Sequence, residues 1–432
     1  MAAPPVRTPF FYGWVIVAVS FWANWITAPL NPVVFSIFIV PIRADLGVSL
    51  GTLAWCITAR QISAGISAPV LGHLVDRFGP RWLGVVCAAW AGACLAGLSF
   101  APNIWWMYAL FFISGFSGFG VFGGGQILTG VPPANWFIAK RGRAVSYAMT
   151  GGGLGTASWV VISSLLVTTI GWRTAWLMNA ALIAGTLVPL YGVLMRRRPE
   201  DIGLHPDGAA TAPVTSVGGA HAGHGDEVNF TLRQSMRTSA LWLITAAFML
   251  HTFATNGILF SRVPYWTELG VSPRIIGVAV ASDPFVVMLF TLVFGYLAER
   301  YPLRLITASG GVWRALSMLP MLWPGSAAVF AHNITWGVGS AGMGTGQNLV
   351  IPAYFGRQAQ GAIRGFTSPI MIGAGAMSAP IIGALIDGGV AHQLIFAVAG
   401  AMMFTAGAIF LFVRPPRVPA PTAAEAAHTA PA

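Results

Sequence analysis

The chain has 432 residues, of which 56% are hydrophobic and only 8% are charged, whereas about a quarter of the residues in soluble globular domains carry a charge. This composition excludes a soluble globular protein and favours a chain that lies mostly within a lipid bilayer. The formal net charge of +11 does not indicate a nucleic-acid partner, because the arginines lie in short turns between apolar runs, where membrane topology explains them.

Apolar runs of about 20 residues, the length that crosses a bilayer as a helix, follow one another along the chain. We therefore expect an all-α membrane protein with twelve transmembrane helices. The first run is too long for a signal peptide and lacks a small-residue cleavage pattern, so we expect it to remain as an anchor. The predicted helices cover residues 12–40, 52–75, 82–100, 104–131, 143–170, 173–195, 239–263, 273–298, 303–323, 326–351, 363–387 and 391–413.

A polar stretch separates the sixth predicted helix from the seventh. It divides the chain into a first six-helix bundle over 1–195, a cytoplasmic linker over 196–238 and a second six-helix bundle over 239–414, followed by a disordered tail over 415–432. The middle of the linker is rich in Ala, Gly, Thr and Pro, which cannot bury a core. Its last part, Phe230-Thr-Leu-Arg-Gln-Ser-Met-Arg237, is amphipathic and predicts a short helix on the inner membrane surface.

The basic residues are distributed unevenly between the loops. Seventeen arginine and lysine residues, Arg364 among them, fall at the termini and in the even-numbered loops, against four in the odd-numbered loops, Arg262 among them. Because Lys and Arg accumulate in the cytoplasmic loops of membrane proteins, we expect both termini and the linker on the cytoplasmic side of the cell (inner) membrane.

Two segments of the first half recur in the second half at one fixed offset. The charged turn Gly72-His-Leu-Val-Asp-Arg-Phe-Gly-Pro-Arg81 returns as Gly295-Tyr-Leu-Ala-Glu-Arg300. At the same offset, Val40-Pro-Ile-Arg-Ala-Asp-Leu-Gly-Val-Ser49 returns as Val263-Pro-Tyr-Trp-Thr-Glu-Leu-Gly-Val-Ser272. This duplication predicts two pseudo-symmetric six-helix halves, an architecture typical of alternating-access carriers that bind their substrate between the halves.

The Gly72–Arg81 turn resembles the hallmark loop between helices two and three of the major facilitator superfamily, with Asp76 and Arg77 in the places of the hallmark acid and arginine. Asn135-Trp-Phe-Ile-Ala-Lys-Arg-Gly-Arg-Ala144 and the following Gly151-Gly-Gly-Leu-Gly155 are similar to the segment entering helix five in bacterial monocarboxylate and oxalate:formate-type carriers. The resemblance covers nearly the whole chain. It implies the fold of that superfamily and a secondary transporter.

The chain also departs from these carriers. Phe11-Tyr-Gly-Trp14 lacks the acid that the monocarboxylate group has at the start of helix one, and Asp283 is followed by Val287 where that group has an arginine. The basic residues of the oxalate carriers in helices eight and eleven are missing as well. The resemblance therefore implies a transporter and only favours a carboxylate as its substrate.

Three residues place a charge well inside a predicted helix, away from its ends, where an ionised side chain costs several kcal/mol and is by default a functional candidate. Arg60 shares its helical face with Ser63 and Ser67, so it either binds an anionic substrate or pairs with carbonyl groups of the protein. Asp283, the repeat equivalent of Arg60, either carries a proton or caps a kink at the following proline. Arg314, on the next helix, is a feasible partner of Asp283 and joins it as a coupling candidate. The family resemblance, which places helix nine outside the cavity, favours a structural role instead.

Two glutamines occupy equivalent places in the two halves. Gln126 and Gln347 each follow a glycine-rich run, in predicted helices four and ten, and two such amides could bind a carboxylate or each other. Further candidates for the substrate site are polar residues on predicted helices one, seven and ten: Asn24, His251, Asn256 and Asn348.

Asp76 ends predicted helix two, where its charge opposes the helix dipole unless it faces a base or the N-terminus of another helix. We expect this contact to close the inner side, and the basic residues 140, 141 and 143 offer partners. The full set of candidate gating residues is Asp76, Arg77, Arg81, Lys140, Arg141, Arg143, Glu299 and Arg300.

We predict a secondary active transporter that moves a small organic anion, a monocarboxylate or dicarboxylate, with a proton or in exchange for a counter-anion. The alternative is efflux of lipophilic, drug-like compounds, which the Phe- and Met-rich interior favours. An enzyme is disfavoured, because the sequence holds no nucleophile–base set and no cofactor or metal motif. We expect a monomer in the lipid bilayer.

Overall fold

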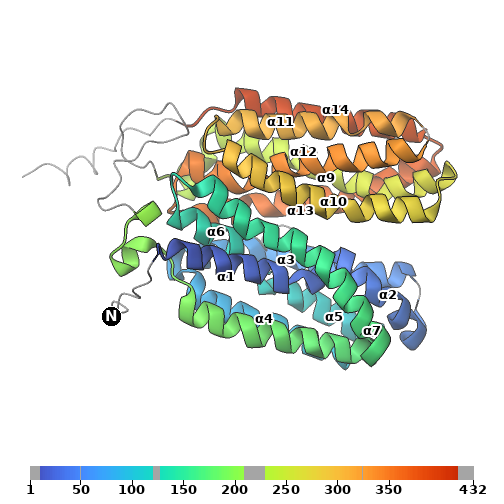
Figure 1. Cartoon of the computed structure of the whole chain (residues 1–432), viewed down its shortest axis with the longest axis horizontal. Helices are drawn as coiled ribbons and strands as arrows, with labels where there is room; N and C mark the ends of the chain where they lie inside the picture. Colours follow the sequence, from blue (N-terminus) through green and yellow to red (C-terminus); the bar gives the residue numbers. More distant parts are fainter. Residues whose placement is uncertain (1–9, 49, 120–126, 209–228, 324, 417–432) are drawn as a thin grey trace, which may run out of the picture.

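The structure is a computed structural model that describes residues 10–416 except 49, 120–126, 209–228 and 324. Within these residues all regular structure is helical, with fourteen α-helices and no strand. Figure 1 shows two bundles side by side, the first half in blue to green and the second in yellow to red, with the helices along the longest axis. Residues 196–208 and 229–238 lie at one end of the bundles, here called the linker end; the opposite end is called the distal end.

The first half contains α1 to α7. Their bounds are α1 Gly13–Ile26, α2 Pro32–Leu46, α3 Leu50–Phe78, α4 Pro80–Ser99, α5 Ile104–Ser114, α6 Ile127–Trp136 and α7 Arg141–Leu194. The last of these is two helices, because Gly171 has φ 78° and ψ 161°, a conformation that only glycine adopts readily. Its two limbs start and finish at the linker end, where Trp136 Nε1 donates a hydrogen bond to the carbonyl of Arg196 (3.2 Å).

Two helices predicted as continuous are broken, so those predictions are wrong. The predicted helix 12–40 divides into α1 and α2, because Pro32 has no backbone N–H to donate and the side chain of Asn31 caps a new helix by accepting from Val33 N (3.0 Å). The predicted helix 104–131 ends in a single turn at Gly115–Ser117, and α6 resumes after the undescribed residues.

The second half contains α8 to α14. Their bounds are α8 Leu232–Met236, α9 Ser239–Glu268, α10 Pro273–Leu297, α11 Leu303–Leu316, α12 Ser326–Phe355, α13 Gln360–Asp387 and α14 His392–Phe412. The short predicted helix after the linker is confirmed as α8, which a capping box between Thr231 and Gln234 starts. The helix predicted over 303–323 ends earlier, at Leu316, and a short turn follows it.

The apolar character of the helices fits a bilayer. Six helices in the described part of the chain are long and apolar enough to cross a membrane by themselves: Pro80–Ser99, Arg141–Leu194, Ser239–Glu268, Arg274–Leu297, Gln360–Asp387 and His392–Phe412. With the broken helices counted as single spans and α7 as two, the order of helices follows the twelve predicted spans.

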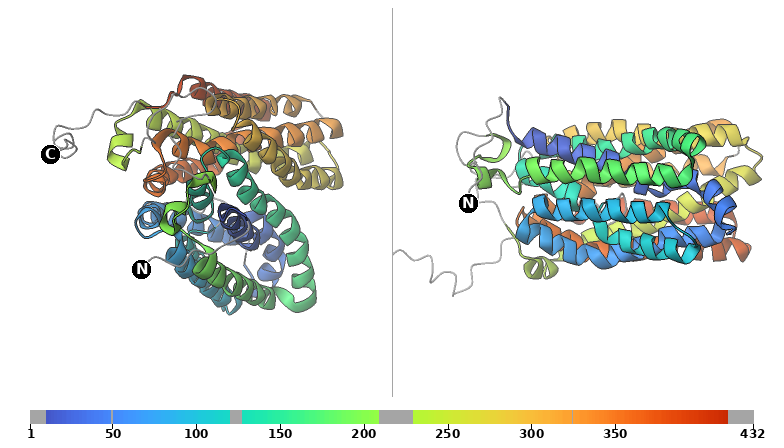
Figure 2. Two further views of the ribbon diagram at one scale, coloured as in Figure 1. Left: turned by 60° about the vertical axis from the view of Figure 1, so that its left-hand side comes forward. Right: turned by 90° about the horizontal axis from the view of Figure 1, so that it is seen from below.

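The two halves meet at places where backbones touch. A Cβ atom on Gly72 in α3 would lie 1.9 Å from the carbonyl oxygen of Gly361 in α13, and one on Gly142 in α7 would lie 2.1 Å from that of Gly295 in α10. Only glycine permits such an approach. Gly72 and Gly295 are the repeat-related glycines of the charged turns, so each half presses the same position against a helix start of the other. Figure 2 shows the two bundles from two further directions.

Candidate functional site

The first charged turn closes onto the second half. Both carboxylate oxygens of Asp76 accept hydrogen bonds from the start of α13, Oδ1 from Gly361 N at 2.9 Å and Oδ2 from Ala362 N at 2.7 Å. These backbone N–H groups have no partner within their own helix, and the positive end of the helix dipole favours a carboxylate there. Asp76 therefore faces the N-terminus of another helix, one of the two arrangements expected from the sequence.

The second charged turn makes the equivalent contact in the opposite direction. Glu299, the repeat equivalent of Asp76, accepts a hydrogen bond from Arg143 N (2.9 Å) at the start of α7 and forms an ion pair with Arg143 Nε (2.8 Å). Each half thus caps one helix of the other half with the acid of its charged turn. The expected pairing of Asp76 with the basic residues 140, 141 and 143 is wrong, because Arg143 binds Glu299 instead.

The other predicted gating residues divide into two groups. Arg141 reaches across the halves and donates Nη1 to the carbonyl of Pro352 (3.2 Å). Arg81 stays within its own half, where Nε donates to the carbonyl of Gly192 (2.7 Å). Arg77 stacks on the ring of Phe78, and Arg300 stacks on the ring of Tyr296. The backbone N–H of Lys140 donates to Asp207 (3.0 Å).

Further contacts between the halves also lie at the linker end. Gln360 Nε2 donates to Asn135 Oδ1 at 2.9 Å, and Arg357 donates Nη1 to the carbonyl of Asn135 at 2.8 Å and forms an ion pair with Glu200 at 3.0 Å. Among the hydrogen bonds recorded for the described residues, those that join the two halves are found at this end. The structure is therefore closed at the linker end.

A small pocket lies just inside this closed end. Its polar wall comes from Gln347 in α12 and Arg364, Thr367 and Ser368 in α13, and its apolar wall includes Ile127 of α6. Arg364 is only 6% exposed, so its assignment to a cytoplasmic loop was wrong: α13 begins at Gln360 and includes it. Both halves contribute to this pocket.

The predicted candidates Gln347 and Asn348 have different positions here. Gln347 lines the pocket, and its Nε2 has only the sulfur of Met371 as a recorded acceptor, at 3.5 Å. Asn348 is buried and holds Arg364, accepting from Nη1 at Oδ1 (3.4 Å) and from Nη2 at its backbone carbonyl. Gln126 lies outside the described residues.

A second buried charge cluster lies within the second half. Asp283 forms an ion pair with Arg262 of α9 (2.8 Å), and Arg262 Nη1 donates to Asn333 Oδ1 (3.2 Å). The assignment of Arg262 to an outer loop was wrong, because α9 continues to Glu268 and leaves this side chain 4% exposed. The backbone-capping alternative for Asp283 finds no support, since its recorded partner is a side chain.

Arg314 belongs to this cluster through an aromatic ring. Its guanidinium carbon lies 3.5 Å from the centroid of the Trp336 ring, a cation–π contact, and the Arg262 guanidinium lies 5.5 Å from the same ring. The predicted Asp283–Arg314 ion pair is not formed. Arg314 Nε and Nη1, and Asp283 Oδ1, are buried without a hydrogen-bond partner.

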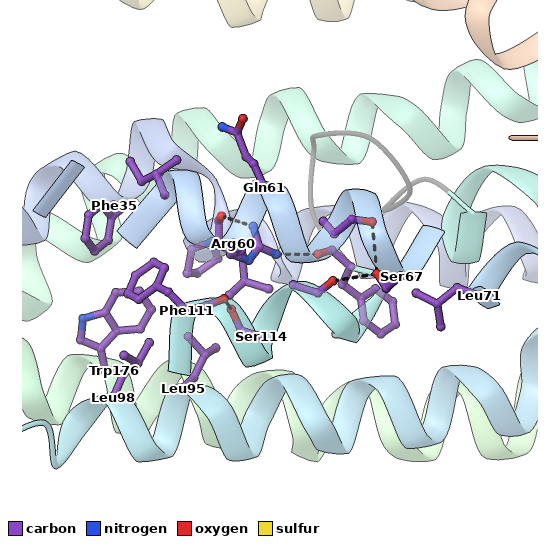
Figure 3. Close-up of a pocket in the computed structure, with 17 residues that line it drawn as sticks. Phe35, Arg60, Gln61, Ser67, Leu71, Leu95, Leu98, Phe111, Ser114 and Trp176 are labelled. Carbon is purple, nitrogen blue, oxygen red and sulfur yellow. Dashed lines mark hydrogen bonds between the residues drawn. The ribbon is translucent and has the colours of Figure 1, made fainter. Parts of the chain in front are cut away.

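Arg60 is bound within the first half. Its Nη1 donates to the carbonyl of Leu30 (2.9 Å) and its Nη2 to that of Phe119 (2.6 Å), each next to a helix break. Figure 3 shows the pocket beside it, where Phe35, Phe111 and other apolar side chains gather and Gln61 points away from them. The lining of this pocket comes from residues 29–176, so it lies inside one half rather than between the two.

The family follows from a sequence comparison. The model of the Major Facilitator Superfamily matches residues 13–266 and 241–432. The chain belongs to this superfamily. It therefore has the all-α fold of that superfamily, whose members are transporters rather than enzymes.

The names of similar proteins in the superfamily state different substrates. The chain is 27% identical to the oxalate:formate antiporter of Oxalobacter formigenes over 57% of this chain and 54% of that one. It is 23% identical to a multi-drug resistance efflux pump PmrA homolog of Lactococcus lactis over 83% and 84%. It is 25% identical to monocarboxylate transporter 9 of Gallus gallus over 47% and 39%. The first match thus spans about half the length of that relative.

The remaining candidates of this superfamily member have partners within one half. Asn24 Nδ2 donates to the carbonyl of Ala148 (2.9 Å), which joins α1 to α7. His251 lies 3.5 Å from the hydroxyl of Thr255 on its own helix. Asn256 packs against Gly375 of α13: a Cβ atom on that glycine would lie 2.3 Å from Asn256 Nδ2. The structure brings none of these three to the pocket of Arg364.

Proposed function

We propose that this transporter moves a small organic anion, a monocarboxylate or dicarboxylate, by alternating access. The single observation that carries the proposal is a surplus of buried positive charge. Among the described residues, Arg262, Arg314 and Arg364 are each more than nine-tenths buried, and only the first has a recorded ion pair with a carboxylate.

A buried guanidinium needs compensation. Arginine stays charged in proteins, and taking an ion out of water costs several kcal/mol unless charge or hydrogen bonds replace the water. A transported carboxylate supplies both, with the two oxygens that match the donor fork of arginine. The names of two relatives, an oxalate:formate antiporter and a monocarboxylate transporter, support the same substrate class.

The moving parts are the two six-helix halves, residues 1–195 and 239–414, joined by the linker 196–238. In the proposed cycle the caps made by Asp76 and Glu299 hold the linker end shut, and their release opens that end to the cytoplasm. Hydrogen bonds to helix starts suit this role, because each contributes modestly and can be exchanged for water.

Asp283 is the proposed coupling group, with Arg314 beside it. Protonation of Asp283 would end its ion pair with Arg262 and leave both arginines available to an anion. Such a link between a proton and an anion describes symport; if Asp283 stays charged throughout, exchange of one anion for another is the coupled reaction.

Efflux of lipophilic compounds is the second candidate, since the match to a drug-efflux relative covers 84% of that protein. Proteoliposome flux distinguishes the two. Uptake of labelled lactate, pyruvate or oxalate, faster than in protein-free liposomes, supports the anion transporter. No uptake of any carboxylate, together with transport of a cationic amphiphile, would establish the alternative.

A further inference from the structure

We propose that the pocket of Arg364 and Gln347, here called the Arg364 pocket, binds the carboxylate group of the transported anion. This inference rests on the proposed function and names its site. From the sequence, Arg60 is the candidate that binds the anion, and Arg364 is placed in a loop. We therefore replace Arg60 with Arg364 as the arginine that binds the substrate carboxylate.

The position of the pocket fits a transported ligand. Its lining combines Ile127 of the first half with Gln347, Arg364 and Met371 of the second half. Alternating access requires the substrate to contact both moving bodies, and it requires the site to lie inside the closed gate. Arg364 follows closely on Ala362, which Asp76 caps, so the pocket is directly inside the closed linker end.

Arg364 is held in place and still has capacity for an anion. Asn348 takes one hydrogen bond from Nη1 and one from Nη2, while Nε is buried without a partner. Within the described residues no carboxylate forms an ion pair with Arg364, and both oxygens of nearby Asp76 are already bound by backbone N–H groups. A buried cation with a free donor and no ion-pair partner is what an anion site presents before its ligand arrives.

Gln347 supplies a second donor. Its amide nitrogen has only a thioether sulfur as a recorded acceptor, and such a sulfur is a weak one. A carboxylate oxygen would replace it with a stronger, charge-assisted hydrogen bond. Ile127, Ile351 and Met371 form the apolar part of the lining, so the ligand class is a small carboxylate with a short apolar body rather than an inorganic anion.

The other buried arginines are less suited to this role. Arg60 spends both of its Nη groups on carbonyl oxygens inside the first half, and Arg262 spends its own on Asp283 and Asn333. In contrast to these, the hydrogen bonds of Arg364 all go to the single residue Asn348. Arg314 also has unpaired nitrogens, but its guanidinium stacks on Trp336 within the second half. A structural explanation, in which Arg364 only ties α12 to α13, accounts for Asn348. It leaves Gln347 with a thioether as its acceptor in a pocket that both halves line.

Equilibrium binding tests the pocket without requiring transport. The melting temperature of the purified full chain is measured against concentration of lactate, pyruvate and oxalate, with lactamide as the uncharged match for lactate, because a ligand of the folded state raises the apparent stability. The variants are Arg364→Gln, Gln347→Glu and, as the control that removes an exposed positive charge, Arg237→Gln.

We expect carboxylates, but not lactamide, to stabilise the wild type and Arg237→Gln. Arg364→Gln should weaken this binding by about tenfold or more, the loss typical of a buried charged hydrogen bond. Gln347→Glu should lose binding while melting higher than the wild type in the absence of ligand, because the new carboxylate supplies the missing counter-charge. A merely structural arginine would not produce this opposite pair of effects.

Two results would overturn the proposal in distinguishable ways. Wild-type carboxylate affinity in both Arg364→Gln and Gln347→Glu would exclude the Arg364 pocket and leave the anion transporter intact. No stabilisation of the wild type by any carboxylate would remove the proposed function itself. If Arg364→Gln does not fold, Gln347→Glu decides alone, since it adds a partner for the arginine instead of removing one.

Discussion

The two halves neutralise charge at repeat-related positions in different ways. Arg60 in α3 and Asp283 in α10 are separated by the same offset as the two charged turns. The first half surrounds its arginine with carbonyl oxygens beside two helix breaks, whereas the second half, where α9 and α10 are continuous, pairs its aspartate with Arg262 of the neighbouring helix. The duplicated scaffold has kept the place of the charge and changed its sign, and the broken helices supply acceptors that intact helices do not expose.

The largest expected effect is on the ion pair of the second half. Asp283→Ala leaves Arg262 buried with an amide and two aromatic rings, and loss of one partner of a buried pair typically costs about 3–5 kcal/mol. We expect the variant to unfold at a clearly lower temperature in detergent. The double variant Asp283→Leu with Arg262→Met removes both charges and should recover most of the stability. An unchanged melting temperature for Asp283→Ala would show that the pair does not hold the second half together.

A smaller loss is expected in the first half. Arg60→Gln removes two charge-assisted hydrogen bonds to backbone carbonyls, and we expect a decrease of about 2 kcal/mol in the free energy of unfolding. Carboxylate affinity, measured by ligand-dependent thermal shift on the folded fraction, should stay within about twofold of the wild type. Normal stability together with lost affinity would instead return Arg60 to the substrate site.

A still smaller effect is expected for the two helix caps at the linker end, which are equivalent in the two halves. Asp76→Asn and Glu299→Gln each weaken one helix cap, an effect of about 1 kcal/mol, which changes the population of the linker-open state roughly fivefold. Ser146 packs against Gly295 and is buried, so Ser146→Cys in a cysteine-free background reports opening through its rate of alkylation. Both variants should raise that rate. A response to only one of them would break the equivalence of the two caps.

The smallest effect is expected for an exposed pair in the second half. Glu268 lies 3.8 Å from His392 with 62% of its side chain exposed, and surface pairs of this kind contribute little. Glu268→Gln should change the free energy of unfolding by less than about 0.5 kcal/mol, which makes it the matched control for Asp283→Ala. A loss as large as that of the buried pair would mean that burial does not determine how much an ion pair contributes to the free energy of unfolding.

The internal repeat was the sequence feature that predicted most about the contacts between the halves. It placed an acid at the same point of each half, and Asp76 and Glu299 make corresponding contacts. The kind of partner could also be predicted from the sequence, since an acid at the C-terminal end of a helix needs a base or the N-terminus of another helix. Which helix start it meets depends on packing between halves, and no local pattern encodes that.

The buried arginines were missed for a different physical reason. Arg262 and Arg364 lie close to predicted helix ends, where propensity and apolar periodicity are weakest as guides. Each stands one residue inside the end of its predicted helix, 239–263 or 363–387, and is therefore counted with the neighbouring loop. The signal that could have found Arg364 is its neighbourhood, because Thr367 and Ser368 follow one turn later on the same face.

Counterflow tests the central claim most directly. Proteoliposomes that contain the wild-type protein are loaded with unlabelled lactate, pyruvate or oxalate and diluted into a trace of the same acid carrying a label. Lactamide-loaded proteoliposomes are diluted into labelled lactate. Transient accumulation of label inside the proteoliposomes is then followed. The account predicts an overshoot with at least one carboxylate inside, none with lactamide, and none for Arg364→Gln at the same internal concentration. Equal accumulation with lactamide, or none with any carboxylate, would contradict a transporter built around a buried arginine and an organic anion.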